Sequence, residues 1–254
     1  MIVVTGCRRS GTSLWMQMLA AAELPIVGEP FAAELEALKD ANPKGFFESE
    51  HRYGVDGDPE ELRGQVVKMF VPGVVETDED ELERVIFSIR PWREHVASTR
   101  AFEALEAEAT GAEVPQAMPA DLEWWFENYC LFGDFADRDY PMMIVAYDRV
   151  LDEPKATAER ALTYLDQGPA KAAAMAAVVD PALRRADPSE VTSELPPEIL
   201  ATFDALYDRI RQREPFDDAF VDRLSATHEA LMPRIEPFLA SDEDEVEVTD
   251  LTGD

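Results

Sequence analysis

The stretch Val4-Thr5-Gly6-Cys7-Arg8-Arg9-Ser10-Gly11-Thr12-Ser13 lies close to the start of the chain, directly after Met1-Ile2-Val3. The apolar, β-branched run before it predicts a buried strand, and the pattern after it predicts a helix over 12–22. Gly6 and Gly11 have the G-x-x-x-x-G spacing of a loop whose backbone N–H groups and helix N-terminus bind a phosphate. The stretch therefore predicts a phosphate-binding turn between a first strand and a first helix. An ordinary strand-to-helix turn with surface arginines is the alternative.

Short apolar runs alternate with longer amphipathic patterns beyond this stretch. They predict strands at 25–27, 66–70, 85–88 and 142–145, and helices at 92–108, 121–132 and 154–165. Such alternation indicates a parallel sheet with right-handed crossovers, whereas the later segments 169–179, 197–213 and 216–239 have helical patterns only. We therefore expect an α/β fold, a P-loop-type three-layer sandwich with a central parallel sheet and a helical C-terminal part.

Composition limits the organisation and the partners of the chain. Of the 254 residues 46% are hydrophobic, which is enough for one core, so residues 1–240 are expected to form a single domain. The chain has 53 acidic against 23 basic residues, a net charge of −30, which argues against nucleic acid and anionic membranes as partners. A strongly solvated surface and adaptation to high salt both remain open explanations. Residues 241–254 contain seven acids and no base, which predicts a disordered acidic tail.

Other classes of site and segment find no support in the sequence. No run approaches the roughly 20 apolar residues of a membrane span, and no basic segment followed by an apolar one opens the chain. Cys7 and Cys130 do not form a disulfide framework, which favours a reducing, cytoplasmic location. The three histidines are scattered, so no metal site is expected. The oligomeric state is not indicated.

The loop departs from that of nucleotide triphosphatases. Those proteins place a lysine at the position of Thr12, where the ammonium reaches the terminal phosphates. Here Arg8 and Arg9 lie inside the loop instead, and a guanidinium can bind a phosphate or sulfate through two parallel hydrogen bonds. The predicted anion-binding residues are the consecutive positions Arg8, Arg9, Ser10, Gly11, Thr12 and Ser13.

The segment Arg9-Ser10-Gly11-Thr12-Ser13 resembles the 5′-phosphosulfate loop of the sulfotransferases that use 3′-phosphoadenosine 5′-phosphosulfate (PAPS). A second segment is similar to the motif with which that family holds the 3′-phosphate: Arg90 follows an apolar run, Pro91 comes next, and Ser98 lies eight positions beyond Arg90. Weaker similarity extends over 42–48, 145–151 and 180–185. The resemblance implies PAPS as sulfuryl donor, no metal, and Arg90 and Ser98 as ligands of the 3′-phosphate.

The resemblance also implies catalytic roles. Arg9 matches the family's catalytic Lys/Arg at the sulfate and the leaving oxygen, and Lys68 matches a basic residue that some members direct at the sulfuryl group. Cytosolic members have a histidine as general base where this chain has Phe70. Among the carboxylates, Glu29 sits like the base of tyrosylprotein sulfotransferases and Glu48 is the competing candidate, and both stay open.

The expected function is a metal-independent sulfotransferase that transfers the sulfuryl group to a hydroxyl or amine of an unidentified small-molecule or glycan acceptor. One alternative is a non-catalytic PAPS-binding protein, because the common histidine base is missing. The other is a P-loop nucleotide kinase or NTPase. The aromatic residues Trp124, Trp125, Phe126 and Tyr129 have helical spacing and are expected to pack in the core rather than bind the acceptor.

Overall fold

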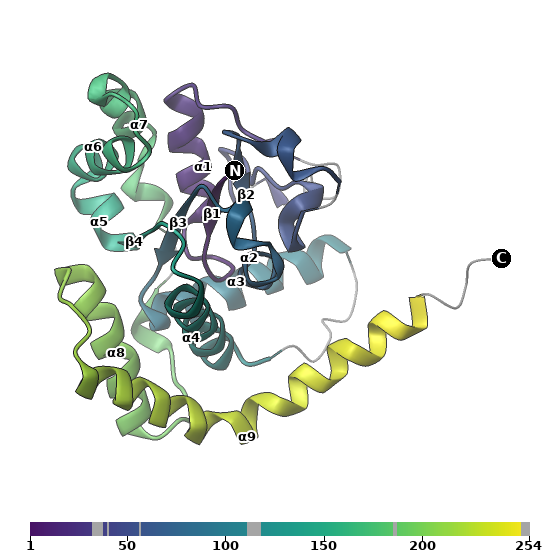
Figure 1. Cartoon of the computed structure of the whole chain (residues 1–254). Helices are drawn as coiled ribbons and strands as arrows, with labels where there is room; N and C mark the ends of the chain where they lie inside the picture. The colour runs from purple at the N-terminus through teal and green to yellow at the C-terminus, as the bar shows by residue number, and fades with distance from the viewer. Residues whose placement is uncertain (32–37, 40, 56, 111–117, 185–186, 250–254) are drawn as a thin grey trace.

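The computed structural model describes residues 1–31, 38–39, 41–55, 57–110, 118–184 and 187–249. Its centre is a sheet of four parallel strands in the order β2-β1-β3-β4 (Figure 1), with bounds β1 Ile2–Thr5, β2 Val66–Lys68, β3 Arg84–Ile89 and β4 Met142–Ala146. Ile2 is paired with Val66 on one side and with Arg84 on the other, so β1 is an inner strand. The loop that follows β1 therefore opens at the carboxyl edge between β2 and β3.

The predicted strand at 25–27 is wrong as a strand of the sheet. Ile26 forms only a single bridge to Val66. Pro25 has no backbone N–H to donate to a ladder, and Gly28 turns the chain away with a φ of 97°. The four other predicted strands are present, with small shifts of their ends.

Helices cover both faces of the sheet, because successive strand residues point to opposite sides. Ile2 and Val4 pack with α1 (Thr12–Ala21), α6 (Pro154–Tyr164) and α7 (Ala172–Val178). Val3 and Phe87 point to the other face, which is covered by α2 (Val71–Glu76), α3 (Trp92–Thr110), α4 (Ala120–Arg138), α8 (Pro197–Gln212) and α9 (Asp218–Thr249). The fold is thus an α/β sandwich, as Figure 1 shows.

The remaining elements are short, and the C-terminal part is helical as predicted. Helix α5 (Tyr147–Asp152) follows β4 directly. Single 3₁₀ turns occur at Glu50–Tyr53, Pro59–Leu62, Glu79–Glu81, Pro169–Lys171, Pro181–Leu183 and Pro188–Glu190. Helix α9 continues through residues 241–249, where the sequence predicted a disordered tail, and residues 250–254 lie outside the described residues. The disorder of 241–254 stays a prediction.

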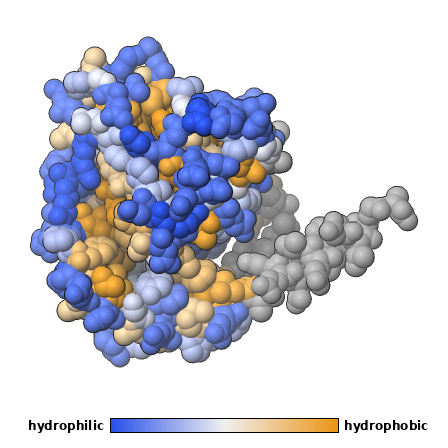
Figure 2. Space-filling view, viewed as in Figure 1, coloured by the Kyte–Doolittle hydropathy of each residue, from blue (hydrophilic) through white to orange (hydrophobic). Residues whose placement is uncertain are grey.

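The core prediction for the aromatic cluster of α4 is confirmed for its two tryptophans. Trp124 and Trp125 are fully buried, and both rings contact Phe203 of α8, with ring centroids 5.2 and 4.9 Å from its own. The outer surface differs: hydrophilic residues cover much of the face in Figure 2. None of the described helices combines the length and the apolar character that a membrane span requires.

Candidate functional site: an anion-binding cavity at the carboxyl edge of the sheet

The loop between β1 and α1 needs glycine at two positions. Gly6 has a φ of 144°, and a Cβ there would lie 2.2 Å from the carbonyl oxygen of Ser88 in β3. Gly11 has a φ of 103°, and a Cβ would lie 2.7 Å from the ring of Tyr147. Both glycines therefore let the loop approach the ends of β3 and β4 more closely than any other residue could. Gly11 immediately precedes α1, whose first N–H groups lack intrahelical partners.

The loop is anchored to β3 through Ser10. The hydroxyl of Ser88 donates to the carbonyl oxygen of Ser10 at 2.8 Å, and the Ser10 amide donates to the carbonyl oxygen of Cys7 at 3.0 Å. Ser10 is buried beneath the loop and does not line the cavity above it. Of the predicted anion-binding residues, Ser10 therefore supports the shape of the loop, while its neighbours face the open side.

A cavity of about 250 Å³ lies over this loop. It brings together residues from the first strand–helix loop, β2, the end of β3, α3 and α5. The predicted site residues on its lining are Arg8, Arg9, Gly11, Thr12, Ser13, Glu48, Lys68, Arg90 and Ser98. Segments almost 90 residues apart in the sequence therefore meet at one carboxyl edge of the parallel sheet, where ligands of open α/β sheets bind.

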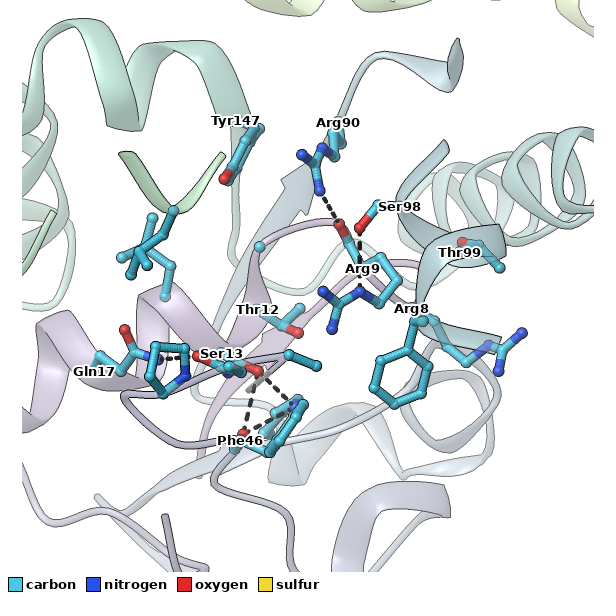
Figure 3. Close-up of a pocket in the computed structure, with 18 of the residues that line it drawn as sticks. Arg8, Arg9, Thr12, Ser13, Gln17, Phe46, Arg90, Ser98, Thr99 and Tyr147 are labelled. Carbon is cyan, nitrogen blue, oxygen red and sulfur yellow. Dashed lines mark hydrogen bonds between the residues drawn. The ribbon is translucent and has the colours of Figure 1, made fainter. Parts of the chain in front are cut away.

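Arg9 connects the two predicted motifs. Its Nε donates to Ser98 Oγ at 3.2 Å (Figure 3), and its guanidinium lies 4.8 Å from the centre of the Phe102 ring. Within the described part of the chain, Arg9 forms no ion pair with a carboxylate. Burial, followed by the positive charge of Arg90, lowers the pKa of Arg9 to about 10. The backbone of Arg9 has a φ of 64°, a left-handed conformation that is uncommon for residues other than glycine.

Arg90 leaves the end of β3 and turns toward the loop. Its Nη1 donates to the carbonyl oxygen of Arg9 at 3.1 Å, and its guanidinium lies 4.6 Å from the centre of the Tyr147 ring. Its Nε is 3.3 Å from the buried carboxylate of Glu94, which also pairs with Arg184. Arg184 also pairs with Asp148, so two carboxylates balance Arg90 and Arg184, and the positive charge left over in this corner among the described residues is that of Arg9.

Arg8 points away from Arg9, as Figure 3 shows. Its Nε is 3.0 Å from Glu123, and its Nη2 is 3.5 Å from Glu103. Burial alone would lower the pKa of Arg8, but these carboxylates raise it. Arg8 therefore reaches the edge of the cavity with its charge already paired, and Arg9 is the loop arginine available to a ligand.

Titratable groups gather beneath the loop. Burial and the nearby charge of Glu123 raise the pKa of Glu127 to about 8, and Glu127 lies in hydrogen-bonding contact with the thiol of Cys7. Burial also raises the pKa of Cys7, so the thiol stays protonated. His95 is fully buried, with its Nε2 3.9 Å from Glu123. These groups support the loop from below and do not line the cavity.

Lys68 and Glu48 form a buried pair on the opposite side of the cavity. The Lys68 ammonium donates to Glu48 Oε1 at 2.5 Å, to the carbonyl oxygen of Phe46 at 2.9 Å and to Ser13 Oγ at 3.1 Å. Burial lowers the pKa of Lys68, and the charge of Glu48 opposes this effect only in part. The second oxygen of Glu48, Oε2, is buried and has no hydrogen-bond partner.

The structure separates the two carboxylates proposed as general base. Glu48 lines the cavity, whereas Glu29 is exposed and is absent from its described lining. The two residues form a backbone bridge, so the segment of Glu29 runs beside that of Glu48 while its side chain faces outward. Arg9, Glu48 and Lys68 are brought together, and Glu29 is not. Phe70, at the position where the resemblance led us to look for a histidine, also lines the cavity.

Three further residues of the site went unnoticed in the sequence. Tyr147 contacts the guanidinium of Arg90, and Phe102 contacts that of Arg9. Glu94 joins Arg90 to Arg184. A helical reading of 92–108 could have found two of them, because Glu94 lies four residues before Ser98 and Phe102 four residues after it, which places all three on one face of α3.

In the described part of the chain, no group of three or more histidine, cysteine, aspartate or glutamate side chains is arranged to hold a metal ion. The cavity combines a helix N-terminus, the neighbouring guanidiniums of Arg9 and Arg90 and the buried Lys68–Glu48 pair. Among the described residues, Arg90 pairs with Glu94 and Arg9 forms no ion pair. Compared with known proteins, the chain matches no family model and no curated sequence.

Proposed function

We propose that the chain is a PAPS-dependent sulfotransferase built on a P-loop-type sheet. The observation that carries the proposal is the unpaired guanidinium of Arg9 in the cavity. In a chain with 53 acidic and 23 basic residues, carboxylates are abundant, yet none pairs with this cation among the described residues. A charge that is desolvated without a partner costs stability. Such a cation is expected where an external anion supplies the partner.

The chemistry of the loop favours a phosphate or sulfate as that anion. The N-terminus of α1 offers backbone N–H groups and the positive end of the helix dipole. Thr12 adds a hydroxyl at the first turn and Arg9 adds a guanidinium, whereas the Ser13 hydroxyl donates to the carbonyl oxygen of Phe46 at 3.3 Å and would have to turn from it to reach the anion. These donors suit the oxygens of a 5′-phosphosulfate.

A second anionic group on the same ligand is supported by Arg90 and Ser98. Arg90 contacts the carbonyl oxygen of Arg9, and Ser98 accepts a hydrogen bond from the Arg9 side chain. If the 5′ end of a nucleotide lies on the loop, Arg90 and Ser98 are therefore close enough to bind a 3′-phosphate of the same molecule. This arrangement favours PAPS over nucleotides that carry phosphates at one end only.

Sulfuryl transfer requires positioning and neutralisation of developing charge. The acceptor oxygen attacks sulfur, the bond from sulfur to the 5′-phosphate oxygen breaks, and the electron pair stays on that oxygen to give adenosine 3′,5′-bisphosphate. In this proposal Arg9 stabilises the leaving oxygen, and Lys68, which donates to Ser13 at the start of α1, binds the sulfuryl oxygens. Glu48 lies beside Lys68 and takes the acceptor's proton.

Calorimetric titration with adenosine 3′,5′-bisphosphate tests the donor site. The wild type is expected to bind it more tightly than adenosine 5′-monophosphate, and Arg90→Met to remove that preference. Arg93→Met is the matched control, because Arg93 lies on the same segment but pairs with Asp204 outside the cavity. Equal affinities of the wild type for the two nucleotides would contradict the proposal.

Transfer of labelled sulfate from PAPS to a panel of acceptors tests catalysis. Binding of the bisphosphate without any transfer would favour the non-catalytic PAPS-binding alternative. Magnesium-dependent ATP hydrolysis, with no preference for the 3′-phosphate, would favour the kinase or NTPase alternative.

A further inference from the structure

The part of the cavity beside Lys68 contains a carboxylate oxygen that has no hydrogen-bond partner among the described residues. Lys68 holds Glu48 through Oε1, whereas Oε2 is buried and has no partner. A buried carboxylate oxygen without a hydrogen bond is costly unless a ligand donates to it. Glu48 lies beside Lys68, which contacts Ser13. If PAPS binds as proposed above, a ligand group that donates a hydrogen bond to Glu48 Oε2 would therefore lie next to the sulfuryl group.

Apolar side chains line much of the cavity that contains this oxygen. Phe46 and Phe102 line the cavity with ring centroids 6.3 Å apart, and Phe70 lines it beside Lys68. Leu105, one helical turn beyond Phe102, also lines the cavity and is 40% exposed. Tyr53 is 61% exposed and its ring centroid lies 5.2 Å from that of Phe70. The cavity that contains Glu48 therefore offers aromatic and aliphatic carbon to a ligand.

The cations of the cavity are all accounted for before an acceptor enters. Arg8 pairs with Glu123 and Lys68 with Glu48, and the proposed donor uses Arg9 and Arg90. An anionic acceptor would thus find no spare cation among the described lining residues.

The amide nitrogens of Gln17 and Asn42 on the lining already donate to protein oxygens, whereas the Thr99 hydroxyl on the lining has no partner among the described residues. The amide groups of Gln17 and Asn42 donate to the carbonyl oxygen of Gly45, and Gln17 donates to Asn42 as well. A polyhydroxylated acceptor would need side-chain donors and acceptors for its several hydroxyls, because hydroxyls buried without partners are costly.

We propose that the acceptor is an uncharged, largely apolar alcohol or phenol, whose hydroxyl donates to Glu48 Oε2 and whose body packs against Phe46, Phe102 and Leu105. This inference rests on the proposed sulfotransferase function and narrows its acceptor class. The acceptor oxygen forms a bond to sulfur, the bond to the 5′-phosphate oxygen breaks, and the hydroxyl proton moves to the Glu48 carboxylate.

The test compares acceptors with labelled PAPS and wild-type protein. 2-Naphthol and 1-octanol are expected to accept sulfate at least about tenfold more efficiently, as kcat/KM, than glucose or a glucuronate-containing disaccharide, a ratio that a few apolar contacts can supply. Preference for either sugar overturns the acceptor inference. If the bisphosphate binds and no acceptor in the panel reacts, the inference also fails, whereas the donor site stands. If the bisphosphate does not bind, the proposed function itself fails.

Two variants test the roles of the named residues. Leu105→Asn is expected to raise the KM for 2-naphthol about fivefold with little change in kcat, because a rim contact is lost. Val75→Asn is its control, since Val75 is equally exposed but lies outside the cavity lining. Glu48→Gln is expected to lower kcat about 100-fold or more while binding of the bisphosphate persists, which shows that the variant folds. Unchanged kinetics for either variant would contradict the assignment.

Discussion

Replacing Arg9 by methionine should separate the stability of the protein from its ligand binding. The pKa of about 10 means that the charged guanidinium is disfavoured in the folded state. Each unit of pKa corresponds to about 1.4 kcal/mol, so the charge costs the free protein about 3 kcal/mol at pH 7, where arginine is charged in both the folded and the unfolded chain.

Methionine removes this cost together with two favourable contacts. The hydrogen bond to Ser98, at 3.2 Å, contributes about 1 kcal/mol, and the contact with the Phe102 ring about 0.5–1 kcal/mol. Arg9→Met should therefore raise the free energy of unfolding of the ligand-free protein by about 1–2 kcal/mol. With adenosine 3′,5′-bisphosphate at 100 times its Kd, the wild type gains about 2.7 kcal/mol that the variant lacks.

Urea unfolding at pH 7 with and without the bisphosphate measures both effects. The variant should be the more stable protein without ligand and the less stable one with it. Arg63→Met serves as control, because Arg63 is exposed and pairs with Glu60 outside the cavity. A ligand-free variant less stable than the wild type, or a variant that keeps the full ligand-dependent gain, would refute the view of Arg9 as a cation held for an external anion.

Three other substitutions probe the surroundings of the site. Glu127→Gln should have a free energy of unfolding in urea about 2 kcal/mol or more above that of the wild type at pH 8.5, and this difference should fall below about 1 kcal/mol at pH 5. The reason is that a carboxyl with a pKa raised from 4.5 to about 8 loses its stabilising contribution as the pH rises between these values; a difference independent of pH would contradict the burial of its charge. Gly11→Ala should lower the free energy of unfolding by about 1–3 kcal/mol and abolish binding of the bisphosphate, because the φ of Gly11 is 103° and a Cβ would lie 2.7 Å from a carbon of the Tyr147 ring. Gly133→Ala is the control and should be tolerated, since a Cβ on Gly133 of α4 would meet no atom within 4 Å. Lys68→Met should destabilise the protein by about 3–5 kcal/mol, because Glu48 is left buried and unpaired, and the double variant with Glu48→Gln should regain most of this stability. If the losses of stability of the two single variants, measured by thermal unfolding, simply add in the double variant, the two residues do not act as a pair.

Local sequence was sufficient for the order of elements and for the loop. The β-branched runs at β1, β3 and β4 and the spacing of Gly6 and Gly11 are short-range signals, and the structure has strands and a tight turn there. The segment 25–27 misled the prediction because an apolar run does not reveal how far its backbone pairing extends. Pro25 and Val27 both bond to Val66, but the pairing stops at this single bridge, because Pro25 has no N–H to donate and Gly28 turns the chain.

The sequence by itself determined that a glycine loop with two arginines follows the first strand. It also determined that Arg90 precedes a helix and that Ser98 lies about two turns into it, because backbone preferences and helical periodicity act over a few residues. Only the tertiary structure decided which charges remain free. Glu123, more than 100 residues away, pairs with Arg8 and not with Arg9, and Glu48 turns toward Lys68 while Glu29 faces outward. Among 53 acidic residues, such choices depend on the packing of α4 and of the segment around Glu48, since electrostatic partners are set by distance in space and not along the chain.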